Sequence, residues 1–503
     1  MSAAEESETV FYGNWRQPSR AGLGKLSAAA TFVLFAALVA TLIANMVGGL
    51  LPAFVTAVGS GGILFSLIRK DGHGLTRLHK IGERVMFRRA RRRGLTVYRS
   101  GPAGVVPTGT CQLPGVLSAT RVSEFVDSWG RPFAVIAHPA VSTYAVVLAV
   151  QPDGDALVDQ YQIDVQVARW GHWLAALSGE PGLVGASVVV ETIPDSGTRL
   201  RQEIHSHIDA RAPELAKRVM DEIQAVYPVG SAAVSCYITL TFTAATVYRL
   251  GGARRSLEEF GREVATRIPG LTGALSGTGA GTVRPVGAEE IARIVRVAYD
   301  PAAQALFDEA ALAGQTARVE WAEAGPAGAD ALRDRYVHDS GVSMTWMMTG
   351  APTGQIQSNL LTRLLEPNQR VARKRVALLY RPIDVARAAD IVDRDVNDAS
   401  ARLGNMRRPT ERAKVAYAQA VRTSREEAQG AGLENFGMVV TATGTSSSEL
   451  ADIKATVEAL AASVRIRIRP AYGAQDAAFA VGLPVGVVPM LHSRVSERVR
   501  EAL

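Results

Sequence analysis

The stretch LSAAATFVLFAALVATLIANMVGGLLPAFVTAVGSGGILFSLI, residues 26–68, contains no Asp, Glu, Lys, Arg or His. Core helices of soluble proteins are seldom this long, whereas one transmembrane helix needs roughly 20 apolar residues. Gly48, Gly49 and Pro52 interrupt the run and divide it into one segment at 26–46 and a second at 50–68. At 1.5 Å per residue each segment covers about 28–32 Å, the thickness of the hydrocarbon layer. The sequence therefore predicts a transmembrane hairpin of two helices joined by a short turn.

The residues that flank this stretch indicate its orientation. The N-terminal tail, residues 1–25, carries Arg16, Arg20 and Lys25, and a basic segment begins at Arg69, whereas the connecting turn is uncharged. Loops rich in Lys and Arg stay on the cytoplasmic side, so we expect a multi-pass protein of the cell (inner) membrane with both termini in the cytoplasm. A cleavable signal peptide does not fit, because more than twenty residues, three of them glutamates, precede the apolar stretch.

Residues 69–104 form a basic juxtamembrane segment. Between residues 69 and 99 there are eleven Lys or Arg against two acidic residues, a surplus larger than the net charge of +7 of the whole chain. Leu75, Leu78, Ile81 and Val85 recur every three or four residues between the cations, which predicts an amphipathic helix on anionic lipid headgroups. The residues expected to set the orientation and contact the membrane surface are Arg69, Lys70, Arg88, Arg89, Arg91, Arg92 and Arg93. Nucleic acid is an alternative partner, but it is not favoured because the rest of the chain is near neutral.

Small residues recur every four positions on both apolar segments. Such stripes allow two helix backbones to approach closely, so we expect them to face each other in the hairpin. The residues are Ala36, Ala40 and Ala44 in the first segment and Ala53, Ala57 and Gly61 in the second. The alternative is that the stripes only reflect the abundance of alanine.

From about residue 105 the chain alternates short apolar or β-branched segments with amphipathic ones, a pattern typical of an α+β fold. Strands are predicted at 133–137, 144–150, 186–192, 232–243, 343–350, 376–382, 436–443 and 464–469, and helices at 155–177, 199–225, 257–267, 288–298, 384–403, 410–429 and 448–463. The Gly-rich segment 270–287 is predicted as a loop and the Ala-rich segment 302–333 as linker and helix. We expect a cytoplasmic body of two ferredoxin-like α+β halves, 105–300 and 301–503. Strand 234–242 alternates polar and apolar residues, which predicts a sheet with one open face.

Several kinds of chemistry are not indicated. The composition, 47% hydrophobic and 20% charged, excludes disorder as the main state, and the only two cysteines, Cys111 and Cys236, are far apart. No G-x-x-x-x-G-K-[ST] or G-x-S-x-G motif occurs, so neither ATP hydrolysis nor a serine nucleophile is expected. Trp170 and Trp173 are interpreted as packing of an amphipathic helix. We expect no catalytic residues, no cofactor and no metal.

The layout resembles that of a known family. A short tail with Tyr12-Gly13-Asn14-Trp15, an apolar hairpin, a basic helix and a body without a nucleotide motif resemble an actinobacterial family of membrane proteins encoded with conjugation and secretion machinery. The hairpin is similar to the PrgI-type subunit of type IV secretion systems, and the body to the N-terminal part of their transport ATPase. Near the C-terminus, the segment from Phe479 to Gly486 is similar to that family's Phe-x-x-x-Leu-Pro-x-Gly segment, which there leads to the motor domain. The EccE-like component of type VII secretion has a related layout and stays an alternative.

The resemblance implies a non-enzymatic inner-membrane scaffold of a secretion or conjugative transfer complex. Because the chain ends at Leu503, where the motor would begin, we expect a separate cytoplasmic motor ATPase to dock on the body. Other membrane subunits are expected partners, in a homo- or hetero-oligomer. The alternatives are a membrane-anchored enzyme with a dispersed active site and a basic adaptor that guides DNA.

Overall fold

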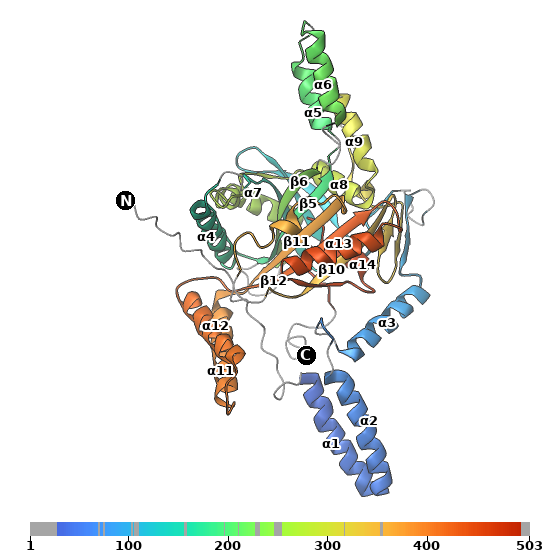
Figure 1. Cartoon of the computed structure of the whole chain (residues 1–503), viewed down its shortest axis with the longest axis vertical. Helices are drawn as coiled ribbons and strands as arrows, with labels where there is room; N and C mark the ends of the chain where they lie inside the picture. Colours follow the sequence, from blue (N-terminus) through green and yellow to red (C-terminus); the bar gives the residue numbers. More distant parts are fainter. Residues whose placement is uncertain are drawn as a thin grey trace.

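The computed structural model of the chain describes residues 28–68, 71–73, 76–101, 104, 110–154, 158–195, 197–209, 211–226, 232–245, 254–315, 317–352 and 356–493. It shows a mixed α+β body built on one large antiparallel sheet, with a helical pair that extends away from the body (Figure 1). The predicted tail, residues 1–25, and the predicted surface residues Arg69 and Lys70 lie outside the described residues.

Three helices precede the body. α1 (Ala28–Gly48) and α2 (Leu50–Ile68) run antiparallel, and Gly49 at the turn between them has the positive φ of 77° that glycine tolerates (Figure 1). The window Thr31–Gly48 has a mean hydropathy of 2.1 and is long and apolar enough to cross a membrane, while the apolar part of α2, Leu50–Phe65, is shorter. α3 (Arg77–Arg92) begins after Thr76, whose hydroxyl caps the helix by accepting a hydrogen bond from the His79 N–H.

The described part of the body contains eleven further helices. They are α4 (Gln160–Leu177), α5 (Thr198–His207), α6 (Glu214–Val226), α7 (Leu257–Gly273), α8 (Ala288–Tyr299), α9 (Ala303–Leu312), α10 (Thr362–Leu365), α11 (Val385–Gly404), α12 (Glu411–Ala428), α13 (Leu450–Ser463) and α14 (Gln475–Val481).

The sheet has thirteen strands, which pair in the order β1-β8-β9-β10-β12-β11-β5-β6-β4-β3-β2, with β7 on β4 and β13 on β10. Their bounds are β1 (Val97–Arg99), β2 (Arg121–Val126), β3 (Pro132–His138), β4 (Thr143–Gln151), β5 (Leu183–Pro194), β6 (Ala232–Thr243), β7 (Thr282–Pro285), β8 (Gly328–Ala331), β9 (Tyr336–His338), β10 (Gly341–Gly350), β11 (Arg373–Pro382), β12 (Glu434–Gly444) and β13 (Arg467–Pro470).

The two parts of this sheet repeat the same arrangement. The chain order β4-α4-β5-β6-α7-β7 gives the spatial order β7-β4-β6-β5, and β10-α10-β11-β12-α13-β13 gives β13-β10-β12-β11. Each part carries a helical hairpin at the same point, α5–α6 before β6 and α11–α12 before β12. β5 and β11 pair antiparallel at the junction, with Val189 opposite Ala377. The two parts are therefore related by an approximate two-fold rotation, and their hairpins project from opposite sides of the body (Figure 1).

Helices and the C-terminal segment cover both faces of the sheet. Side chains alternate between the two faces along each strand, so each face has its own apolar core. On one face α4, α7 and α13 pack on residues such as Val146, Leu240 and Val440. On the other face α8, α14 and the segment 482–493 cover residues such as Ala145 and Val189. The prediction of an open face was wrong, since the C-terminal segment lies across it: the Thr241 hydroxyl donates to the Gly486 carbonyl at 3.2 Å.

The structure corrects several predicted boundaries. Helix 199–225 is two helices, α5 and α6, and helix 155–177 begins only at Gln160, after its cap Asp159. The predicted loop 270–287 contains the end of α7 and strand β7, and the predicted linker 302–333 contains α9 and β8. The last predicted strand begins at Arg467, because Val464 still caps α13.

Candidate functional site

The two apolar helices pack on faces that differ from those predicted. On α1 the less exposed residues are Thr31, Val33, Leu34, Ala37, Thr41 and Ala44, and on the described part of α2 they are Ala53, Thr56, Ser60 and Leu64. Of the predicted stripes only Ala44 and Ala53 are shielded, whereas Ala36, Ala40, Ala57 and Gly61 are exposed. A Cβ added at Gly61 meets no atom within 4 Å. The predicted pairing of the stripes is therefore corrected. The contact face of each helix lies about one residue away from the predicted stripe, so four of the six predicted residues point outwards.

The outer surface of the pair is apolar. Phe32 is 75% exposed and Phe54 70% exposed, and leucine, isoleucine and valine side chains fill the surface between them. The hydroxyls are satisfied inside their own helices: Thr41 Oγ1 donates to the Ala37 carbonyl at 2.8 Å and Ser60 Oγ to the Thr56 carbonyl at 2.6 Å. An apolar surface of this extent, with hydroxyls bonded to the backbone of their own helix, suits a lipid environment.

The basic helix α3 is fixed to the body by one buried ion pair. Arg469, at the end of β13, donates from Nη1 and Nη2 to the two carboxylate oxygens of Glu83 at 2.9 and 2.6 Å, and its side chain is 7% exposed. One turn later Phe87 lies against Gly473, where an added Cβ would come within 3.3 Å of the Phe87 Cβ. Glu83 and Phe87 thus form the face of α3 that contacts the body, and they orient the rest of the helix.

The exposed surface of α3 combines apolar side chains with cations. Ile81 is 52% exposed, Val85 56% and Met86 73%. Successive helical residues are rotated by about 100°, so Ile81 and Val85 point away from the side that holds Glu83. The described arginines at the end of the helix are exposed and make no ion pair with another described residue: Arg88, Arg89, Arg91, Arg92 and Arg93. Leu75 and the side chain of Leu78, which complete the predicted stripe, lie outside the described part of the chain.

A buried charge cluster lies where the two parts of the sheet meet. Glu191 on β5 accepts from Arg375 Nη2 on β11 at 2.9 Å, and Arg373 Nη1 is 3.5 Å from the same oxygen. Burial alone would raise the pKa of Glu191, but the attraction of Arg375 and Arg373 holds it below its usual value. Arg375 is 3% exposed, and its Nε and Nη1 atoms have no hydrogen-bond partner among the described residues. The guanidinium instead lies over the Phe479 ring, 5.6 Å from its centroid.

Phe479 is also the first residue of the segment 479–486, on which the resemblance to the secretion ATPase rests. Its ring is 4.9 Å from that of His338 and 5.0 Å from that of Tyr299, centroid to centroid. Gly486 has φ 78°, and a Cβ there would lie 2.3 Å from the Ala145 Cβ. In the described fold this segment therefore serves close packing across both parts of the sheet.

Two histidines at the ends of equivalent strands are buried and neutral. His338 Nδ1 donates to the Tyr299 carbonyl at 2.6 Å, so Nε2 accepts from the Ser343 hydroxyl at 2.7 Å. His138 Nε2 donates to the Val485 carbonyl at 2.7 Å. Burial lowers the pKa of each imidazole to about 4. They act in packing and hydrogen bonding, and neither lines either of the two surface grooves described below.

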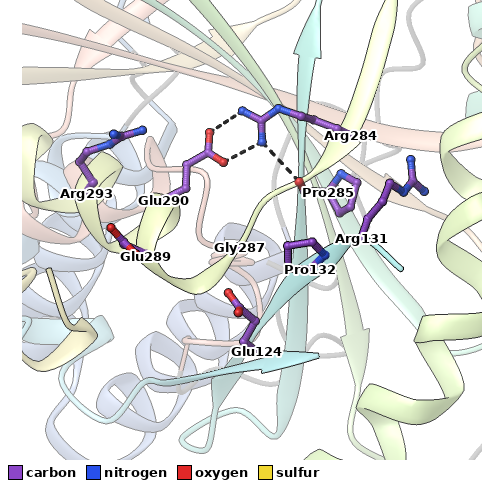
Figure 2. Close-up of a pocket in the computed structure, with 9 residues that line it drawn as sticks. All are labelled: Glu124, Arg131, Pro132, Arg284, Pro285, Gly287, Glu289, Glu290 and Arg293. Carbon is purple, nitrogen blue, oxygen red and sulfur yellow. Dashed lines mark hydrogen bonds and ion pairs between the residues drawn. The ribbon is translucent and has the colours of Figure 1, made fainter. Parts of the chain in front are cut away.

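Two surface grooves of the body are possible ligand sites. One, of 410 Å³, lies beside the start of α8 and is lined by three arginines, three glutamates, two prolines and Gly287 (Figure 2). Arg284 pairs with both oxygens of Glu290 at 2.7 Å (Figure 2). Glu124 accepts from the Ala288 N–H at 2.8 Å. The other, of 1220 Å³, runs along α13. Glu191 and Glu434, whose pKa values are shifted, line neither groove.

The N-terminal part of the chain matches a known protein family. Residues 19–78 match the family described as Domain of unknown function (DUF8461). The match covers α1, α2 and the start of α3, but not the body. No curated protein is similar in sequence to the chain.

Sequence reasoning missed the contacts that place these groups. Glu83 and Arg469 are 386 residues apart, and Glu191 and Arg375 are 184 apart. One signal was present: Arg373-Lys374-Arg375 directly precedes a predicted buried strand, and three cations at such a position indicate a buried partner. Trp173 is buried and stacks on Trp170 at 4.8 Å, which confirms the packing interpretation.

Proposed function

We propose that this protein is a non-enzymatic scaffold of the inner membrane, belonging to a secretion or conjugative transfer complex. In this proposal α1 and α2 cross the membrane as a hairpin, both termini are cytoplasmic, and the body holds a separate motor ATPase at the membrane. The observation that carries it is the apolar outer surface of α1–α2 next to a helix, α3, that is fixed to the body and whose arginines at positions 88–93 are exposed.

The body in this proposal consists of two ferredoxin-like halves joined edge to edge. The support is the repeated βαββαβ order, in which each first strand lies between the third and the fourth. The shared β5–β11 pair and the C-terminal segment that crosses to β6 make the halves one rigid unit. A rigid body of this kind suits a scaffold, because it fixes the distance between a partner and the bilayer.

We propose α6 as the surface that binds the motor ATPase. Leu215 is 66% exposed, Val219 44% and Ile223 39%, and their four-residue spacing places them on one face of the helix. Such an unpartnered apolar face is typical of a helix that lies in the groove of another protein. The α5–α6 hairpin projects from the side of the body opposite to α1–α2, where a cytoplasmic partner has access (Figure 1).

Replacing Leu215, Val219 and Ile223 by Ser is expected to reduce capture of the motor ATPase at least tenfold when the tagged full chain is purified from native membranes. The residues are exposed, so the melting temperature of the purified protein should hardly change. Partners are identified and quantified by mass spectrometry, and the kind of ATPase separates a type IV-like from a type VII-like complex. The control is Val385→Ser with Val415→Ser on the α11–α12 hairpin, where the exposed fractions are 62% and 54%. Equal capture by both variants contradicts the assignment to α6.

An enzymatic function is not favoured by this geometry. Catalytic carboxylates are expected in a cleft with a partner that tunes them. Glu191 is enclosed by two arginines, and Glu434, whose pKa is raised by burial to about 7, does not line either groove. Glu191 is accounted for by its two arginines, and Glu434 has no partner among the described residues that would tune it for catalysis.

A further inference from the structure

We propose that the tip of the α11–α12 hairpin is a second membrane contact, which binds anionic lipid headgroups on the cytoplasmic face. This inference rests on the proposed function, because it takes the bilayer to be where α1–α2 is. It concerns a surface that is remote in sequence from the basic segment 69–104.

The chemistry of the tip matches a headgroup layer. Its arginines are all exposed, and none makes an ion pair with another described residue: Arg402, Arg407, Arg408 and Arg412. The neighbouring acid, Glu411, is bound by Lys414 at 2.7 Å. Met406, at the turn, is 40% exposed. One guanidinium group can bind two oxygens of a phosphate at once. A flexible apolar side chain between such groups can enter the headgroup region of the bilayer.

The position of the tip also favours contact with the membrane. The hairpin extends from the body on the side of α1–α2, and its tip reaches the level of their body-side ends (Figure 1). α11 has 20 residues, about 30 Å in length, and its base is held in the body by Ala388 and Val392, which pack on Leu433. The tip is therefore presented at a fixed place rather than on a free loop.

The other half of the molecule provides an internal comparison. The α5–α6 hairpin occupies the equivalent place in the first half but projects to the opposite side (Figure 1). Residues 208–214 at its tip contain Asp209, Arg211 and Glu214, a net charge of −1, whereas residues 402–412 carry four arginines and one glutamate, a net charge of +3. The basic tip occurs on the hairpin that faces the side of α1–α2.

The test uses a fluorophore at the tip that reports on its surroundings. The full chain, with Met406→Cys in a Cys111→Ser, Cys236→Ala background, is labelled with a polarity-sensitive dye and reconstituted in nanodiscs. We expect a blue shift and quenching by lipid-borne quenchers with 30% phosphatidylglycerol, but not with phosphatidylcholine alone. High salt should weaken the shift, since exposed charge pairs are screened. Replacing the four tip arginines by Gln should abolish it. The matched control, Arg211→Cys in the other tip, should show no lipid dependence.

A second probe separates failure of this inference from failure of the proposed function. Phe54→Cys on α2, 70% exposed in the structure, should report an apolar environment in both lipid mixtures. A Phe54 probe in lipid with a Met406 probe that stays in water in both mixtures overturns the second contact alone. A Phe54 probe in water overturns the membrane hairpin, and the inference with it.

Discussion

Glu191→Ala is expected to lower the free energy of unfolding of the body by about 3–5 kcal/mol, the range for removing one partner of a buried ion pair. The substitution leaves Arg373 and Arg375, 7% and 3% exposed, without their shared carboxylate at the junction of the two halves. Two nitrogen atoms of Arg375 already lack a hydrogen-bond partner among the described residues. No described acceptor is therefore at hand to replace the lost carboxylate of Glu191. Urea unfolding of the detergent-solubilised full chain, followed by tryptophan fluorescence, measures the effect.

The matched control for this prediction is Glu203→Ala. Glu203 also pairs with a potential cation, His207, but both side chains are 73% exposed, so the change should be within about 0.5 kcal/mol. A loss for Glu191→Ala as small as for Glu203→Ala means that the junction does not depend on this cluster.

The same groups determine how stability responds to acid. The lowered pKa of Glu191 means that its stabilisation is present above the carboxyl's usual pKa and is lost as the pH falls further. His138 and His338, with pKa values of about 4, remain neutral in the fold but take up protons near pH 6.5 when unfolded. Stability should therefore fall from pH 6.5 towards 4 for the two histidines. The raised pKa of Glu434, about 7, offsets part of that fall, because the fold binds a proton that the unfolded chain takes up only near pH 4.5. Stability should fall again at lower pH as Glu191 and Asp127, whose pKa values are both lowered, are protonated. In Glu191→Ala this second decline should be smaller, and the first should remain.

Replacing Arg88, Arg89, Arg91, Arg92 and Arg93 by Gln is expected to release α3 from the membrane surface and to give a mixed orientation of the hairpin. At about 1 kcal/mol per cation near an anionic surface, the five together contribute up to ~5 kcal/mol. They are also five of the eleven Lys and Arg residues between positions 69 and 99, the charge that is expected to hold the body in the cytoplasm. A reporter fused to the C-terminus measures the orientation, and a polarity-sensitive probe at Val85→Cys measures the contact of α3 with lipid.

The control for α3 changes the net charge equally but elsewhere. Five exposed arginines of the body are replaced by Gln: Arg121, Arg254, Arg262, Arg293 and Arg387. This variant should keep the orientation and the Val85 signal. If both variants behave like the wild type, the charge of α3 does not determine how the protein sits at the membrane.

The body's secondary structure was largely predictable, and the long-range pairing was not. Long strands such as β6, at Ala232–Thr243, were predicted because β-branched residues recur along them. β1, β8 and β9 have only three or four residues and depend on neighbours that no local pattern reveals. The edge pairing of β5 with β11, which makes one sheet of two halves, leaves no local signal either.

The candidate membrane surface was predicted in part. The run 26–68 and the arginines of α3 follow from composition, because charge is absent from the first and concentrated in the second. The helix faces did not follow: Ala36 and Ala40 recur at a plausible spacing, yet Ala37 and Thr41 are the shielded residues. Spacing alone allows several faces for contact, and only packing against α2 selects one. The ion pair of Glu83 with Arg469, which orients α3, required the tertiary fold.

The proposed function depends most on α1–α2 crossing the membrane as a hairpin with the body in the cytoplasm. Val47→Cys, near the turn and 84% exposed, tests it directly by labelling with a membrane-impermeant maleimide in spheroplasts. Ser447→Cys, on an exposed loop of the body, is the internal reference. We expect the Val47 site to be labelled in intact spheroplasts and the Ser447 site only after permeabilisation. Labelling of both sites only after permeabilisation, or of Ser447 alone in intact spheroplasts, would contradict it.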